Sequence, residues 1–198
     1  MLTGVFSGLF RLGSATAAEI IGAQPDIACY AKILSGGLVP LALTLASPSI
    51  FETFAHPEKT RALLHGHSYT AHPVGCAVAL EALSQIDSLH ASGAWADAQA
   101  DWQSTRGWSM WSRARVLELS RREHVSGAWA LGTVLTIELG GNAGYQSTIA
   151  ESLVTALRAH GMHVRPLGNV VYIMCSLNTS ASVLRRTEDI VSTLLDCT

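Results

Sequence analysis

Residues 25–50 read PDIACYAKILSGGLVPLALTLASPSI and hold a single lysine between two apolar runs. The first run, residues 27–30, carries no charge, and the second, residues 41–46, follows a glycine pair and a proline. Short apolar runs bounded by glycine and proline are typical of strands, and glycine lets a backbone come close to a ligand. We therefore predict a strand, a turn that carries Lys32, and a second strand.

Lys32 is one of only two lysines in the chain, the other being Lys59. An ammonium group among apolar neighbours is costly to desolvate, which favours the neutral amine. A neutral lysine amine is a nucleophile that forms a Schiff base with a carbonyl cofactor. On the pattern alone, a solvated lysine at a strand end is the commoner arrangement, and glycine pairs also occur in plain turns. Lys32 is thus a candidate for Schiff-base chemistry that has a purely structural alternative.

The segment around Lys32 resembles the lysine segment of class III pyridoxal-phosphate-dependent aminotransferases. The pattern D-I-x-x-x-x-K-x-L-x-G-G-x-x-P-L is matched by Asp26, Ile27, Lys32, Leu34, Gly36, Gly37, Pro40 and Leu41. The resemblance implies an α/β fold that is the C-terminal part of a fold type I transferase, with a partial large domain and a small α+β domain. It also implies pyridoxal 5'-phosphate (PLP) as cofactor, a homodimer as the family's assembly, and Lys32 as the catalytic residue that binds PLP.

The first residues of the chain match the family only in part. The family pattern D-E-V-x-x-G-x-x-R-x-G is met by Val5, Gly8, Arg11 and Gly13, but Thr3 and Gly4 stand where the family has Asp-Glu. In the family that Asp pairs with the pyridine nitrogen of PLP and keeps it protonated, which makes the ring an electron sink. Thr3 carries no charge, so the resemblance implies a defect at this position.

Three histidines fall within the segment LLHGHSYTAHP, residues 63–73. Their spacing gives no i, i+4 pair and the segment contains no carboxylate, so we predict no metal site. The segment resembles the H-G-hydroxyl stretch that class III aminotransferases place against the cofactor phosphate of the neighbouring subunit. The resemblance implies that His67 and Ser68 bind the cofactor and that Gly66 lies on the substrate side. The alternative is that Ser68 merely caps the next helix.

Arg165 follows a short apolar run and precedes a proline, in the segment GMHVRPLGNVVY. An arginine at a strand end can hold a carboxylate through two parallel hydrogen bonds, although most such arginines are simply exposed. The segment resembles that of one branch of the family, the adenosylmethionine–8-amino-7-oxononanoate aminotransferases of biotin synthesis. The resemblance implies that Arg165 and Tyr172 bind the carboxylate substrate, and it is strongest to the aminotransferase part of eukaryotic bifunctional proteins.

The rest of the chain reads as alternating helices and strands. A serine–proline pair predicts a helix that begins near residue 48, and apolar spacing predicts a helix over residues 73–89. We predict helical structure up to residue 122 with interruptions near Gly93 and Gly107, then strands at 131–139, 162–165 and 170–174 and helices at 146–160 and 180–195. Residues 1–110 are expected to form the C-terminal part of the PLP-binding large domain, and residues 111–198 a small α+β domain.

Composition narrows the classes of partner. The 198 residues carry a formal charge of −2, which gives no reason to expect nucleic acid or an anionic membrane as partner. The four cysteines are far apart in sequence, which favours a reducing compartment over a disulfide scaffold. We see no targeting signal and no apolar run long enough for a membrane span, so we expect a cytoplasmic or mitochondrial protein.

Three hypotheses remain open on the sequence. In the first, the chain transfers an amino group from a donor such as S-adenosylmethionine to 8-amino-7-oxononanoate, giving 7,8-diaminononanoate in biotin biosynthesis. In the second, the chain is a truncated aminotransferase that is inactive alone, as the missing Asp and the absent N-terminal half of the family suggest. In the third, it is another class III aminotransferase that acts on ω-amino or ornithine-like substrates.

Overall fold

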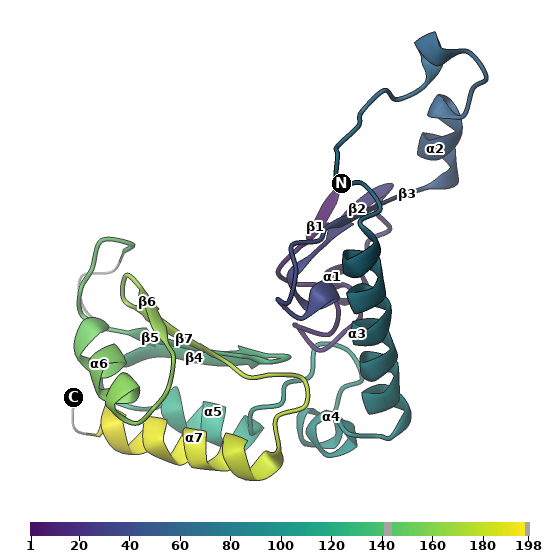
Figure 1. Cartoon of the computed structure of the whole chain (residues 1–198). Helices are drawn as coiled ribbons and strands as arrows, with labels where there is room; N and C mark the ends of the chain where they lie inside the picture. Colours follow the sequence, from purple (N-terminus) through teal and green to yellow (C-terminus); the bar gives the residue numbers. More distant parts are fainter. Residues whose placement is uncertain (141–143, 197–198) are drawn as a thin grey trace. The chain divides into compact units, whose positions relative to one another are not determined.

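Figure 1 shows the computed structural model of the chain, which describes residues 1–140 and 144–196. The chain divides into two compact units, Met1–Ser92 and Gly93–Thr198, called unit 1 and unit 2 below. The units therefore part well before the expected domain boundary between residues 110 and 111.

Buried tryptophans explain why the segment after Ser92 belongs to unit 2. The indole N–H of Trp95 donates to the Leu177 carbonyl at 3.0 Å, and that of Trp111 donates to the Thr133 carbonyl at 3.0 Å. Both side chains are almost fully buried. A buried indole needs a hydrogen-bond partner, and these two find theirs in the C-terminal part of the chain.

Unit 1 is built on a three-stranded sheet in the order β1-β2-β3, with β1 parallel to β2 and β3 antiparallel to it. The strands are β1 (Leu2–Gly4), β2 (Ile27–Tyr30) and β3 (Leu43–Ala46). Between β2 and β3 lies a short 3-10 helix, η1 (Lys32–Ser35). The predicted order of strand, lysine-bearing turn and strand is confirmed.

The helices of unit 1 follow the local sequence signals closely. They are α1 (Ala17–Ile21), α2 (Pro48–Phe54), the 3-10 helix η2 (Lys59–Arg61) and α3 (Pro73–Ala91). Helix α2 begins at a proline after Ser47, as the serine–proline pair predicts, and the long helix α3 matches the predicted apolar spacing. Residues 1–21 are mostly turn and loop, with β1 paired to β2 at one end and α1, capped by the Thr16 hydroxyl, at the other.

Unit 2 is a four-stranded antiparallel sheet in the order β4-β5-β7-β6, with helices α5 and α7 beside it in Figure 1. The strands are β4 (Val125–Leu131), β5 (Val134–Leu139), β6 (Arg165–Leu167) and β7 (Val170–Met174). The helices are α4 (Ala96–Trp102), α5 (Arg113–Leu119), α6 (Glu151–Ala159) and α7 (Ala181–Leu195). Alternate residues of β5 and β7 enter the core, where Leu135, Ile137 and Val171 are fully buried.

Three predicted boundaries in unit 2 are wrong. The single strand over 131–139 is a hairpin, because Leu131 pairs with Val134 across a two-residue turn. The helix over 146–160 begins only at Glu151. The strand over 162–165 begins at Arg165, because the Val164 carbonyl is taken by the guanidinium of Arg158 instead of a neighbouring strand.

None of the described helices has the length and apolar character that crossing a membrane requires. Cys29 and Cys76 are free thiols, the Cys175 thiol donates to the Thr133 carbonyl at 3.5 Å, and Cys197 lies outside the described residues.

Candidate functional site

Lys32 stands at the start of η1, directly after β2, with its backbone in the left-handed region at φ +57°. Such a backbone costs a side chain other than glycine about 1–3 kcal/mol and is found most often at functional sites. The side chain is exposed and lines an open cavity of about 740 Å³ together with Val5, Gly37 and Leu41. The amine is thus presented to a space that a small molecule can enter.

The expectation of a desolvated amine at Lys32 is wrong for this chain. Lys32 is exposed, and so are all four residues of β3, which lies in the second apolar run. The feature that the structure does supply is the ring of Phe6, whose centroid lies 5.2 Å from Lys32 Nζ.

The residues around Lys32 fit the aldehyde end of PLP but offer no charged partner for its pyridine nitrogen. An exposed amine on an open cavity fits the aldehyde of PLP, which lysine amines bind covalently. Thr3 lies in the middle of β1, opposite Cys29 of β2, and is exposed. Strand β1 contains no carboxylate, so it offers no charged partner for the pyridine nitrogen.

The histidine segment, with Gly66, His67 and Ser68, lies in the exposed connection between η2 and α3. His67 Nδ1 accepts the Tyr69 amide at 3.1 Å, within its own turn. In the part of the chain that the structure describes, no hydrogen bond or ion pair joins these three residues to Lys32. The alternative in which Ser68 caps the next helix is wrong, because α3 is capped by His72, whose Nδ1 accepts the Gly75 amide at 3.1 Å.

Arg165 and Tyr172 lie directly opposite each other on the hairpin of β6 and β7. Val171 and Ile173, on either side of Tyr172, point into the core, so Tyr172 belongs to the other face of the sheet. Directly paired residues of an antiparallel hairpin share a face, which puts Tyr172 and the exposed Arg165 on the same face of the sheet. The hairpin brings together the two residues predicted to bind a carboxylate substrate.

The turn of this hairpin is held firmly to the rest of unit 2. Asn169 is buried, and its side-chain amide donates to Glu138 Oε1 at 3.2 Å and to the Leu139 carbonyl at 3.1 Å. Gly168 has φ +63°, and a Cβ there would lie 2.1 Å from the Gly144 carbonyl oxygen. Only glycine fits this position, so the turn that carries Arg165 is strongly specified.

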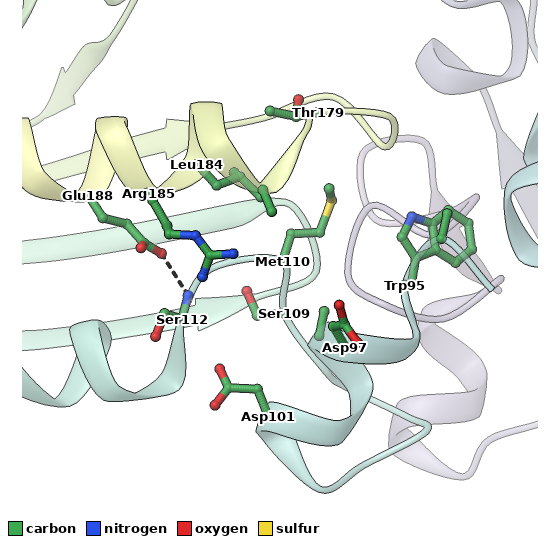
Figure 2. A pocket seen from close by; sticks show the side chains of 13 residues that line it. Trp95, Asp97, Asp101, Ser109, Met110, Ser112, Thr179, Leu184, Arg185 and Glu188 are labelled. Carbon is green, nitrogen blue, oxygen red and sulfur yellow. Dashed lines mark hydrogen bonds between the residues drawn. The ribbon is translucent and has the colours of Figure 1, made fainter.

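Unit 2 also contains a cavity of about 310 Å³ between α4 and the start of α7, shown in Figure 2. Its carboxylates come from Asp97, Asp101 and Glu188, and its guanidinium from Arg185. Glu188 is buried and accepts the Ser112 amide at 2.7 Å (Figure 2). Burial raises the pKa of the Glu188 carboxyl. None of the residues predicted from the sequence to act in catalysis lines this cavity.

A network of charges ties α5 to α7 on the surface of unit 2. Arg115 bonds Glu118 and Asp189, and Arg122 bonds Glu118 and Asp196. The hydrogen bond from Arg115 lowers the pKa of the Glu118 carboxyl. These groups are at least a quarter exposed, so the network orients the helices more than it stabilises them.

The predicted site residues fall into two groups. Lys32 and the segment 66–68 belong to unit 1, whereas Arg165 and Tyr172 belong to unit 2. Sequence reasoning missed Phe6, which occupies a variable position of the family pattern between Val5 and Gly8. No sequence signal marks it, because its relation to Lys32 arises only when β1 pairs with β2.

Comparison with known proteins finds a family model and relatives that are all aminotransferases. A family model described as aminotransferase class-III matches residues 3–195. A bifunctional dethiobiotin synthetase/adenosylmethionine-8-amino-7-oxononanoate aminotransferase from Emericella nidulans is 48% identical over 199 residues, covering 94% of this chain and 25% of that protein. A bifunctional dethiobiotin synthetase/7,8-diamino-pelargonic acid aminotransferase, mitochondrial, from Arabidopsis thaliana is 41% identical, covering 92% and 22%. The chain thus spans about a quarter of the length of these relatives.

Solved structures show the same fold. An adenosylmethionine-8-amino-7-oxononanoate aminotransferase from Methanocaldococcus jannaschii aligns with a TM-score of 0.79 at 24% identity, over 97% of this chain and 44% of that one. An amine transaminase from an uncultivated Pseudomonas species, in its PLP-bound form, aligns with a TM-score of 0.79 at 21% identity, over 97% and 43%. The α/β fold therefore corresponds to part of a fold type I transaminase. Because the family model matches nearly every residue, the chain belongs to the class III aminotransferase family.

Proposed function

We propose that this chain carries the lysine and carboxylate-binding parts of a PLP-dependent aminotransferase that acts on 8-amino-7-oxononanoate. The observation that carries the proposal is the exposed Lys32 at the edge of an open cavity, in a backbone conformation that costs free energy. The family is PLP-dependent, and two relatives that match more than nine-tenths of the chain are named for amino transfer in biotin synthesis.

The residues have separate roles in this proposal. Lys32 would hold PLP covalently and, once released, would serve as the base that removes the proton from the amine-bearing carbon of the substrate. PLP, when bound, supplies an electron sink for the carbon that loses its proton. His67 and Ser68 supply hydrogen-bond donors for the phosphate of PLP, and Gly66 lies on the substrate side. The proposed assembly is a homodimer like those of the family.

Arg165 and Tyr172 are the proposed substrate-binding pair. A guanidinium holds a carboxylate through two parallel hydrogen bonds, and a neighbouring phenol adds a donor and an apolar ring. Their direct pairing on the β6–β7 hairpin supports this role, because one turn fixes both residues. The relatives' names point to 8-amino-7-oxononanoate as the carboxylate substrate and to S-adenosylmethionine as an amino donor, and one of the names gives a mitochondrial location.

A second candidate is favoured by Thr3. In this candidate the polypeptide alone is an inactive part of an aminotransferase, because Thr3 cannot hold a proton on the pyridine nitrogen. The chain also spans only about a quarter of the length of its curated relatives. We therefore propose that amino transfer requires the segments of the relatives that this chain does not cover.

A turnover assay tests the second candidate. The purified chain as sole protein is given PLP in excess, 8-amino-7-oxononanoate, and adenosylmethionine or lysine as donor. We expect no appreciable 7,8-diaminononanoate, and turnover near 1 s⁻¹ or faster, within the usual range of enzymes, would show that the chain is sufficient.

The role of Arg165 is tested by Arg165→Ala in a chimaera that joins this chain, with Thr3→Asp, to the preceding segments of a full-length relative. Loss of a charge-assisted pair should cost about 1.5–3 kcal/mol, so KM for the oxononanoate should rise about tenfold or more while PLP binding is retained. The matched control is Arg186→Ala, an exposed arginine on α7. An unchanged KM in the Arg165 variant would contradict the role.

A further inference from the structure

Phe6 lies beside two cations of unit 1, Lys32 and Arg11. Lys32 Nζ is 5.2 Å from the centroid of the Phe6 ring, and the guanidinium carbon of Arg11 is 5.7 Å from it. Both distances fall within the range of about 6 Å over which the negative face of an aromatic ring attracts a cation. The face of one ring therefore attracts both cations.

A tight turn after β1 brings Phe6 to this position. The Gly8 amide donates to the Gly4 carbonyl at 2.9 Å, which closes a turn with Phe6 at its centre. The turn packs on Tyr30, the last residue of β2, so closely that a Cβ at Gly8 would lie 2.6 Å from the Tyr30 ring. Because Lys32 follows Tyr30 by two residues, the packing of Gly8 on Tyr30 sets Phe6 beside the amine.

The ring is the partner that the structure gives to the lysine amine. Among the described residues, Lys32 has no hydrogen bond and no ion pair with a carboxylate. Its backbone is in the left-handed region, which directs the side chain to the cavity it lines with Val5 and Gly37. The position of the amine therefore depends on the Phe6 ring.

We propose that Phe6 is a positioning residue for Lys32. It holds the protonated amine at the cavity until the amine loses its proton and reacts with a carbonyl compound. This inference rests on the proposed function, in which Lys32 is the residue that binds the cofactor covalently. The attraction acts on the ammonium and not on the neutral amine. Phe6 thus both places the lysine and restrains its reaction until the proton is lost.

The test uses competitive acetylation of the whole chain without cofactor. A trace of acetic anhydride is added between about pH 7 and 11, a range that brackets the ordinary titration of lysine. Peptide mass spectrometry then gives the ratio of acetylation at Lys32 to that at Lys59. Lys59 is the only other lysine and lies on η2, so it is an internal standard in every sample.

Phe6→Leu keeps an apolar side chain and removes the aromatic face, whereas Phe6→Trp keeps an aromatic face that attracts a cation more strongly. We expect the ratio to rise about 2- to 5-fold in Phe6→Leu at the lower pH values, because the ammonium loses its attraction to the ring. The rise should shrink toward the highest pH, because the ring does not attract a neutral amine. In Phe6→Trp the ratio should stay at or below that of the parent chain.

The outcomes are distinct. A rise in Phe6→Leu that persists at every pH, or an equal rise in Phe6→Trp, would mean that the ring merely covers the lysine and would overturn the proposal. An unchanged ratio in Phe6→Leu would overturn it as well. If Phe6→Leu disrupts the fold, Phe6→Trp still decides, since a ratio above the parent's contradicts the proposal. No cofactor is present, so failure here is distinguishable from failure of Lys32 to bind PLP.

Discussion

The two units of this chain differ in where their apolar residues lie. In unit 2, helices cover one face of a four-stranded sheet, and Leu135, Ile137 and Val171 are completely buried. In unit 1, every residue of β3 is exposed and α2 buries none of its side chains. The main buried cluster lies entirely within unit 2. Unit 2 thus completes its own core, whereas the unit that carries the candidate nucleophile does not.

The candidate nucleophile and the main buried core of the chain therefore belong to different units. An exposed edge strand favours pairing with another polypeptide, and exposed apolar side chains do the same where they form a patch. Leu43 and Leu45 of the edge strand β3 are exposed, as is Phe51 of α2.

The largest expected effect is on the core of unit 2. Leu135→Ala should lower the free energy of unfolding by about 2–5 kcal/mol, because it leaves a cavity in a fully buried site. The matched change Leu45→Ala, at a half-exposed side chain of β3 in unit 1, should change it by less than about 0.5 kcal/mol. Urea unfolding followed by tryptophan fluorescence measures the Leu135 variant, since all five tryptophans lie in unit 2, and urea unfolding followed by circular dichroism measures the Leu45 variant. Similar losses in both variants would break the comparison.

The next effect concerns glycines of the two predicted binding segments. Gly168→Ala should destabilise unit 2 by about 1–3 kcal/mol, because the backbone is left-handed and the new methyl would meet the Gly144 carbonyl. Gly66→Ala in unit 1 should change stability by less than about 0.5 kcal/mol, because a Cβ there meets no atom within 4 Å. The same urea titration compares Gly168→Ala with the parent chain, and thermal unfolding by circular dichroism extends the comparison to Gly66→Ala. A tolerated Gly168→Ala would mean that the Arg165 hairpin is less firmly specified.

The smallest effect is a pH dependence in unit 2. A raised pKa means that the Glu188 carboxyl keeps its proton to higher pH in the folded chain than in the unfolded chain, whose value is near 4.5. The Glu188 contribution to the free energy of unfolding therefore falls as pH rises from about 4.5 to the folded pKa, and is constant above it. Glu188→Gln removes this contribution while the amide oxygen still accepts from Ser112. Its stability relative to the parent should increase with pH across that window, and a difference independent of pH would contradict the buried carboxylate.

Features of the fold that local sequence signals encode were predicted, whereas features that depend on distant contacts were missed. The turn at Lys32 and helices α2, α3 and α7 follow from prolines, caps and apolar spacing within the segment itself. The hairpin at Gly132 was missed because the alternation of side chains continues through it. Strand β1 was missed because three residues become a strand only by pairing with β2.

The candidate site divides in the same way. Lys32 and Arg165 stand in recognisable motifs and were predicted from the sequence, and their roles stay predictions. The exposure of Lys32 was not foreseen, because burial depends on what covers β3. Phe6 was not found because its place beside Lys32 comes from the packing of Gly8 on Tyr30.

The central claim, that Lys32 of the exposed unit is the residue that binds PLP, has a direct test. The purified chain is mixed with PLP, reduced with borohydride so that any lysine adduct becomes permanent, digested, and mapped by mass spectrometry. The two lysines permit matched controls, Lys32→Arg and Lys59→Arg. We predict the label on Lys32 in the parent chain and in Lys59→Arg, and none in Lys32→Arg. A label found mainly on Lys59, or retained in Lys32→Arg, would contradict the account.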